Sequence, residues 1–91
     1  MNNPIISPNG TQKWYRNGKC HREDGPAVIY PNGTQLWFLN GARHREDGPA
    51  VIYSNGNQYW YLNDKIYSFN EFIKKSKLSD DEIIMLKLKY E

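Results

Sequence analysis

The amino-acid sequence predicts a mainly β fold, an antiparallel β-meander of three 23-residue hairpin repeats capped by two short C-terminal α-helices. Ten residues from His21 to Tyr30 recur unchanged from His44 to Tyr53, which indicates a repeat with a period of 23 residues. Asn-Gly pairs lie in register at that period between β-prone runs, and Asn-Gly favours the positive φ angles of tight hairpin turns. Two capping boxes after the last repeat predict the helices.

The first repeat starts partway through the period. Its Asn-Gly turn at 9–10 matches those at 32–33 and 55–56, and its tryptophan matches the other two, which gives the series Trp14, Trp37 and Trp60. The segment His-Arg-Glu-Asp-Gly-Pro joins successive hairpins at 21–26 (the first link) and 44–49 (the second link), and no copy of it precedes the first hairpin in this sequence. We therefore expect a hairpin sheet over residues 1–67, with copies at about 4–20, 21–43 and 44–66.

A second turn precedes the end of each copy. It is Asn-Gly at 17–18 and 40–41, whereas the third copy has Asn63-Asp64, and aspartate tolerates positive φ less well than glycine. The Asp-Gly-Pro step of each link adds another reversal, for which Gly25 and Gly48 are expected to supply unusual φ angles.

Alternation along the strands separates two sets of aromatic residues. The three tryptophans are expected to stack as a ladder on the inner face, one repeat apart. The opposite face carries Tyr15, Phe38, Tyr59 and Tyr61, which we call the aromatic face. Two interpretations stay open: this face is covered or strongly twisted, or it is an exposed aromatic stripe that binds a partner.

The repeat ends at Ile66-Tyr67 and gives way to helical signals. Ser68 with Glu71 is a capping box that predicts a helix from 69 to 76, and Ser79 with Glu82 predicts a second one. The second helix should bury the face formed by Ile83, Leu86 and Tyr90. Ile84 and Leu88 are expected to widen this face. Residues 68–91 are thus expected to be a cap on the open end of the stack, within the same domain. The alternative is a helix pair that docks a partner or dimerises.

Composition narrows the functional classes. The single cysteine, Cys20, rules out a disulfide within the chain, and no signal peptide precedes the repeats, so a cytoplasmic location is expected. No apolar run approaches the roughly 20 residues of a membrane span. A net charge of +2 is too small to predict nucleic-acid binding.

The links hold both histidines of the chain, beside arginines and acids, and they are the segments that most resemble a reactive site: His21, Arg22, His44 and Arg45. Equivalent atoms in successive copies should be about 10–14 Å apart. A zinc ion needs its histidine nitrogens at about 2.0–2.1 Å, so the two histidines should not share one metal. No nucleophile-base spacing or phosphate loop is present. We expect no enzyme, cofactor or metal, and either a turn held by Arg–Asp pairs or an edge that binds a partner.

The cadence of Asn-Gly, then Trp with Tyr or Phe, then Asn-Gly resembles the MORN family of β-hairpin repeats, in its bacterial, phage and viral variant. Three segments carry the resemblance, which covers about residues 4 to 66: 9–18, 32–41 and 55–63. It implies an elongated antiparallel sheet without catalysis that acts as a protein-interaction scaffold or a membrane-associated module, and some bacterial variants are labelled antitoxin-like. The inserted links depart from the usual consensus.

These observations favour a non-catalytic protein-interaction module with a protein partner, in concrete form a small phage or viral inhibitor of a host defence enzyme or an antitoxin-like binder. The candidate binding residues are Tyr15, Phe38, Tyr59, Tyr61, His21, Arg22, His44 and Arg45. One alternative is an oligomer, such as a homodimer, that binds a small molecule or nucleotide at the links. Another is a structural subunit that assembles through open sheet edges.

Overall fold

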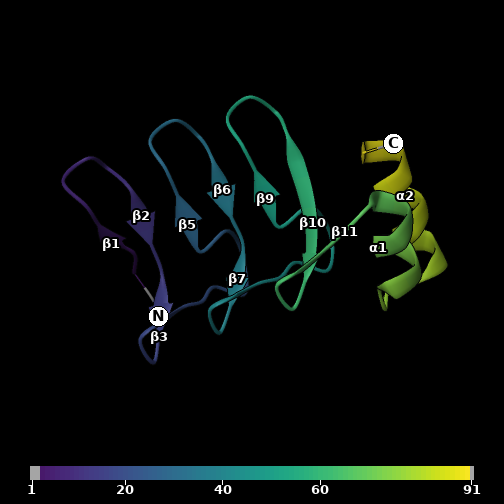
Figure 1. Ribbon diagram of the computed structural model, residues 1–91, viewed down its shortest axis with the longest axis horizontal. Helices are drawn as coiled ribbons and strands as arrows, with labels where there is room; N and C mark the ends of the chain where they lie inside the picture. Colours follow the sequence, from purple (N-terminus) through teal and green to yellow (C-terminus); the bar gives the residue numbers. More distant parts are fainter. Residues whose placement is uncertain (1–2, 91) are drawn as a thin grey trace.

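A computed structural model describes residues 3–90 as an elongated row of hairpins with a helix pair at one end, 41 × 29 × 22 Å in extent (Figure 1). The strands are β1 Ile5–Ile6, β2 Gln12–Lys13, β3 Tyr15–Arg16, β4 Lys19–Cys20, β5 Val28–Ile29, β6 Gln35–Leu36, β7 Phe38–Leu39, β8 Ala42–Arg43, β9 Val51–Ile52, β10 Gln58–Leu62 and β11 Lys65–Tyr67. The helices are α1 Phe69–Lys75 and α2 Asp80–Tyr90. This arrangement confirms the predicted fold class.

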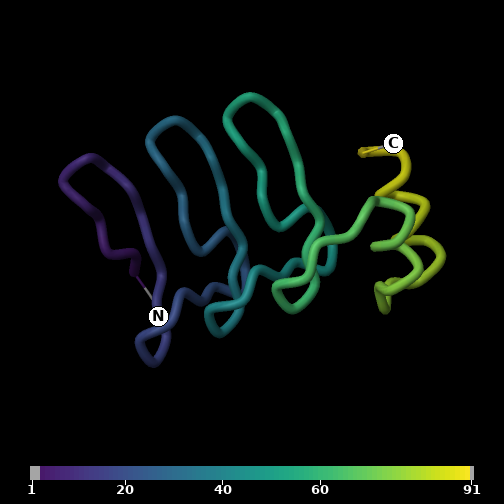
Figure 2. The backbone as a smooth tube through the Cα atoms, in the orientation of Figure 1, coloured from purple at the N-terminus to yellow at the C-terminus, as the bar shows by residue number. Residues whose placement is uncertain are grey.

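Each copy contributes two hairpins, which form two rows of loops (Figure 2). The hairpins around the first turns belong to a seven-stranded antiparallel sheet in the order β1-β2-β5-β6-β9-β10-β11. The hairpins around the second turns are β3-β4 and β7-β8 in the first two copies. In the third copy the long strand β10 belongs to both rows, because it pairs with β9 along one part and with β11 along the other.

The second turns have the same backbone in all three copies. Asn17, Asn40 and Asn63 have φ angles of 51°, 50° and 50°. Asp64 follows with a φ of 70°, so the third turn forms although glycine is absent. Its carboxylate accepts hydrogen bonds from the backbone N–H of Arg43 (3.3 Å) and from Arg43 Nε (2.8 Å), which compensate for the less favourable residue. The side-chain hydrogen bond from Arg43 is also the main cause that lowers the pKa of Asp64.

The helices close the C-terminal end of the stack around Trp60. Its ring centroid lies 4.9 Å from Phe69, 4.7 Å from Phe72 and 5.2 Å from Tyr90. Phe72 is fully buried, and Leu86 completes the buried cluster. Both capping boxes form as expected: the Ser68 and Ser79 hydroxyls accept from the backbone N–H of Glu71 and Glu82, whose carboxylates accept in return.

One part of the helix prediction is wrong. Ile84 and Leu88 do not widen the buried face of α2, because they are 55% and 77% exposed, and Met85 beside them is 65% exposed. The cap covers only one tryptophan and its neighbours, so a single narrow stripe of α2 finds apolar partners. Within residues 3–90, neither helix has the length and apolar character to cross a membrane.

Candidate functional site

The first two tryptophans are covered by arginines of the links. Arg22 Cζ lies 3.9 Å from the ring centroid of Trp14, and Arg45 Cζ lies 3.9 Å from that of Trp37. No two tryptophan rings stack on each other among residues 3–90, so the expectation that the three tryptophans stack as a ladder is wrong. A guanidinium covers each ring because a planar cation and a π face attract each other and the alkyl stem adds packing.

Each of these arginines is fixed by further hydrogen bonds within its own link. Arg45 Nε donates to Asp47 (3.0 Å) and Arg45 Nη1 donates to the carbonyl of Pro49 (3.1 Å). Arg22 makes the same two bonds, so the predicted Arg–Asp pairs form inside one link. The arginine side chain in the second link is 16% exposed and its aspartate 78%, which leaves the carboxylate outermost.

The glycines of the links leave room for these guanidinium groups. A Cβ atom on Gly48 would lie 2.6 Å from Arg45 Cζ, and one on Gly25 would lie 3.0 Å from Arg22 Cζ. Neither glycine is among the residues with positive φ, so the expectation of an unusual φ is wrong. A side chain at either glycine would therefore have to displace the guanidinium from its present place.

The histidines join each link to the hairpin that follows it. His21 Nδ1 accepts the backbone N–H of Asn40 at 2.9 Å, and His44 Nδ1 accepts that of Asn63 at 2.9 Å. The other ring nitrogen of each histidine faces a glutamate of the same link, at 3.2 Å and 3.1 Å. A neutral imidazole that accepts at Nδ1 carries its proton at Nε2, where it donates to the glutamate. His21 is only 4% exposed, so its ring lies within the stack and presents little surface to solvent.

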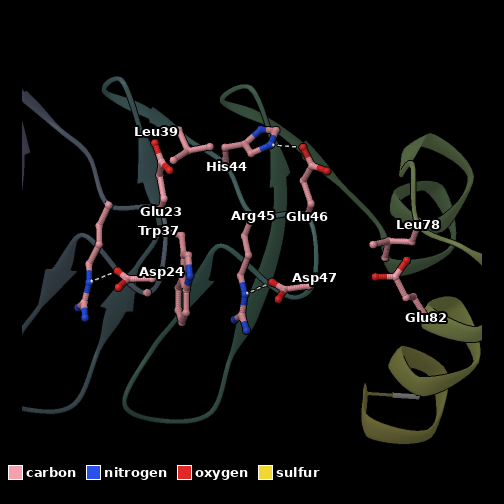
Figure 3. A pocket seen from close by; sticks show the side chains of 12 residues that line it. Glu23, Asp24, Trp37, Leu39, His44, Arg45, Glu46, Asp47, Leu78 and Glu82 are labelled. Atoms are coloured by element: carbon pink, nitrogen blue, oxygen red, sulfur yellow. Dashed lines mark hydrogen bonds and ion pairs between the residues drawn. The ribbon is translucent and has the colours of Figure 1, made fainter.

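A groove of about 510 Å³ runs along the links toward the helices (Figure 3). Trp37 and Leu39 lie between the two Arg–Asp pairs, and Leu78 lies at the helical end. The acids that line it are mostly exposed, with side-chain exposures of 72%, 85%, 57% and 78% for Glu23, Asp24, Glu46 and Asp47. The groove therefore presents carboxylates to solvent, while its arginines are partly covered.

The aromatic face lies on the other side of the sheet. In β10, Tyr59 and Tyr61 point away from the side that holds Trp60. Tyr15 and Tyr59 are 39% and 38% exposed, whereas Phe38 and Tyr61 are partly buried. Arg43 Cζ lies 4.4 Å from the Tyr61 ring centroid, which explains part of that burial. The predicted binding residues thus form two groups, one aromatic and one in the links.

Two tyrosines absent from the sequence prediction extend the aromatic face. Tyr53 is 45% exposed and packs edge-on against Tyr59, with ring centroids 5.8 Å apart, and its counterpart Tyr30 is 37% exposed. Residues two apart in a strand share a face, so alternation would have placed Tyr53 on the same face as Val51. Tyr59 shares that face because it is the cross-strand partner of Val51.

No constellation of residues for metal binding is apparent in the described part of the chain. Among residues 3–90 no three side chains of histidine, cysteine, aspartate or glutamate come together as a metal site. Cys20 is a free, half-buried cysteine.

No protein-family model, curated protein or solved structure matches the chain.

Proposed function

We propose that the protein is a non-catalytic protein-interaction module whose partner binds the aromatic face. The observation that carries this proposal is the set of partly exposed tyrosines on one side of the sheet, while the helices pack on the side of Trp60. Tyrosine provides a large apolar area and a hydroxyl group at low entropic cost, and it is enriched among the residues that dominate binding energy. A rigid sheet presents such side chains with little reorganisation.

The concrete form of this proposal is a small cytoplasmic phage or viral inhibitor of a host defence enzyme, or an antitoxin-like binder. The MORN-like cadence of hairpins supports a scaffold that binds another protein. The histidines and arginines of the links support the scaffold indirectly, because their side chains hold tryptophans and neighbouring hairpins in place.

Affinity capture from a lysate of the source or host cell, followed by mass spectrometry, tests this proposal with matched variants. A partner retained by the native chain should bind at least about tenfold more weakly to a Tyr15→Ala/Tyr59→Ala double variant. Both residues are partly exposed, so the fold should be retained. Met85→Ala, on the exposed side of α2, is the control. Equal retention by the native chain and the tyrosine variant would contradict this placement of the binding surface.

A second candidate is ligand binding at the links. The groove of about 510 Å³ supports it, although the exposed carboxylates disfavour a nucleotide or another anion. This candidate needs an oligomer that brings two sets of links together, and a monomeric native mass would remove its basis. Assembly that rises with concentration would instead favour the structural subunit, which uses sheet edges such as β1.

A further inference from the structure

Each link, together with the residue before it, docks onto the next second-turn hairpin through three hydrogen bonds. At the second copy, Cys20 O accepts from Gly41 N–H (2.9 Å), His21 Nδ1 from Asn40 N–H (2.9 Å), and Phe38 O from Arg22 N–H (3.1 Å). The same three bonds form one repeat later, at 2.8, 2.9 and 3.3 Å, between residues 43–45 and residues 61, 63 and 64. The residue before each link and the first two residues of the link thus supply a carbonyl, an imidazole acceptor and an amide N–H, in that order.

The first copy presents the same three groups at the N-terminal end of the stack. They are the amides of Asn17 and Gly18 and the carbonyl of Tyr15. Among residues 3–90 no hydrogen bond to any of the three is found from a preceding segment. The turn has the conformation of its counterparts, with φ of 51° and 78° against 50° and 82° at Asn40 and Gly41. These groups are therefore already oriented as in the docked copies.

The grooves show the same relationship. A groove of about 600 Å³ lies beside Trp14. Six of its lining residues have counterparts 23 residues later that line the groove beside Trp37. The six residues beside Trp14 are Trp14, Arg16, His21, Arg22, Glu23 and Asp24. The groove beside Trp37 has a further wall made by Arg22, Glu23, Asp24 and Gly25 of the preceding link. At the corresponding place beside Trp14 the described lining is only Asn3 and Pro4.

We propose that this N-terminal end binds an extended segment of another protein that has the chemistry of the links. The segment would carry a central histidine, flanked by a backbone carbonyl on one side and an arginine amide on the other. The histidine Nδ1 accepts from Asn17 N–H, the carbonyl accepts from Gly18 N–H, and the amide donates to Tyr15 O. Because the turn is already in its docked conformation, the hairpin itself needs little reordering on binding.

A second copy of this chain is a poor occupant of this site. Its two links already make these bonds within their own stack, and the chain after its third copy passes into the helices that cover Trp60. Binding of a second copy would require a link to leave its own hairpin. A separate extended segment carries no such cost.

The direct test is a titration of the isotopically labelled 91-residue chain with a blocked peptide of residues 41–49, followed by the backbone amide signals. The peptide should shift the Asn17 and Gly18 amides and leave those of Asn40, Gly41 and Asn63 in place. A His44→Leu peptide should bind about tenfold more weakly, because it lacks the acceptor for Asn17 N–H. An absence of shifts, or shifts centred elsewhere, would overturn the proposal, as would concentration-dependent shifts of Asn17 and Gly18 without peptide.

An extended chain provides the matched control. A copy of residues 4–26 placed ahead of Pro4 supplies one more hairpin and one more link, which should dock onto the hairpin at Asn17. This chain should no longer shift its original Asn17 and Gly18 signals on addition of peptide, and those two amides should become protected from exchange. Continued shifts of the original signals would mean that the peptide uses a different site.

Discussion

The two ends of the stack are covered in different ways. At the C-terminal end Trp60 is 7% exposed, and its ring contacts Phe69, Phe72 and Tyr90. At the N-terminal end the edge strand β1 leaves Ile5 and Ile6 62% and 65% exposed. One end is closed by an apolar core, while the other presents a strand edge and a hairpin with outward-facing polar groups.

Inside the stack the tryptophans are covered by a different chemistry. Trp37 is covered by Arg45, a charged side chain held by an aspartate and a carbonyl. The repeat position of Arg45 is Ser68 in the third copy, where phenylalanines of α1 replace the guanidinium. An arginine over the tryptophan ring suits a position inside the stack, which recurs in successive copies and stays partly exposed to water. An apolar cover suits the final position, where a core can form.

The largest effect should come from opening the closed end. Phe72→Ala removes the fully buried ring from the Trp60 cluster and should lower the free energy of unfolding by about 3–5 kcal/mol. Urea denaturation followed by tryptophan fluorescence measures this loss. Leu88→Ala, at a site 77% exposed, is the control and should change stability by less than about 0.5 kcal/mol. Equal losses of stability in the two variants would contradict the assignment of the apolar core to the Trp60 cluster.

A smaller effect should come from disturbing the charged cover. Gly48→Ala places a methyl group 2.6 Å from Arg45 Cζ and should cost about 1–3 kcal/mol by displacing the guanidinium from Trp37. Gly25→Ala should cost less, since its contact distance is 3.0 Å. In an Arg45→Ala background the Gly48→Ala loss should largely disappear. If the loss persists there, the glycine is required for a reason other than the arginine.

Each histidine should contribute about one hydrogen bond to the stability of the fold. His21→Leu removes the acceptor of Asn40 N–H and should cost about 1–2 kcal/mol, because a partly buried backbone donor loses its partner. His44→Leu should cost slightly less, since the His44 side chain is 11% exposed against 5% for His21. Thermal unfolding of the two variants tests this order. A larger loss for His44→Leu would contradict the burial argument.

The smallest effect concerns the helix caps at low pH. The backbone hydrogen bonds of Ser68 and Ser79 lower the pKa of Glu71 and Glu82 from the ordinary value of 4.5. A lowered pKa means that the stabilisation is present above pH 4.5 and is lost as the pH falls through the folded-state pKa. Helical circular dichroism should decline in that range. A Glu71→Gln/Glu82→Gln variant should decline less, and an equal decline would assign the change to other groups.

The sequence predicted the parts of this fold that depend on local chemistry. Asn-Gly turns and Ser-x-x-Glu boxes act within a few residues, so the hairpins and both caps follow from them. The cover of Trp37 by Arg45 was missed because alternation assigns a face to the ring without specifying what packs on it. The need for Gly48 and the acceptor role of His44 depend on register between copies. The exposed side of α2 was missed because its apolar residues exceed what the cap can bury.

Amide hydrogen exchange of the three equivalent turn residues tests the contrast between docked and open copies most directly. Asn40 and Asn63 donate to histidines and should exchange at least about tenfold more slowly than unbonded amides of the same sequence. Asn17 N–H, in the same turn conformation, should exchange at close to the unprotected rate. Equal protection of all three amides would contradict the account, since it would mean that the first hairpin is closed without a link.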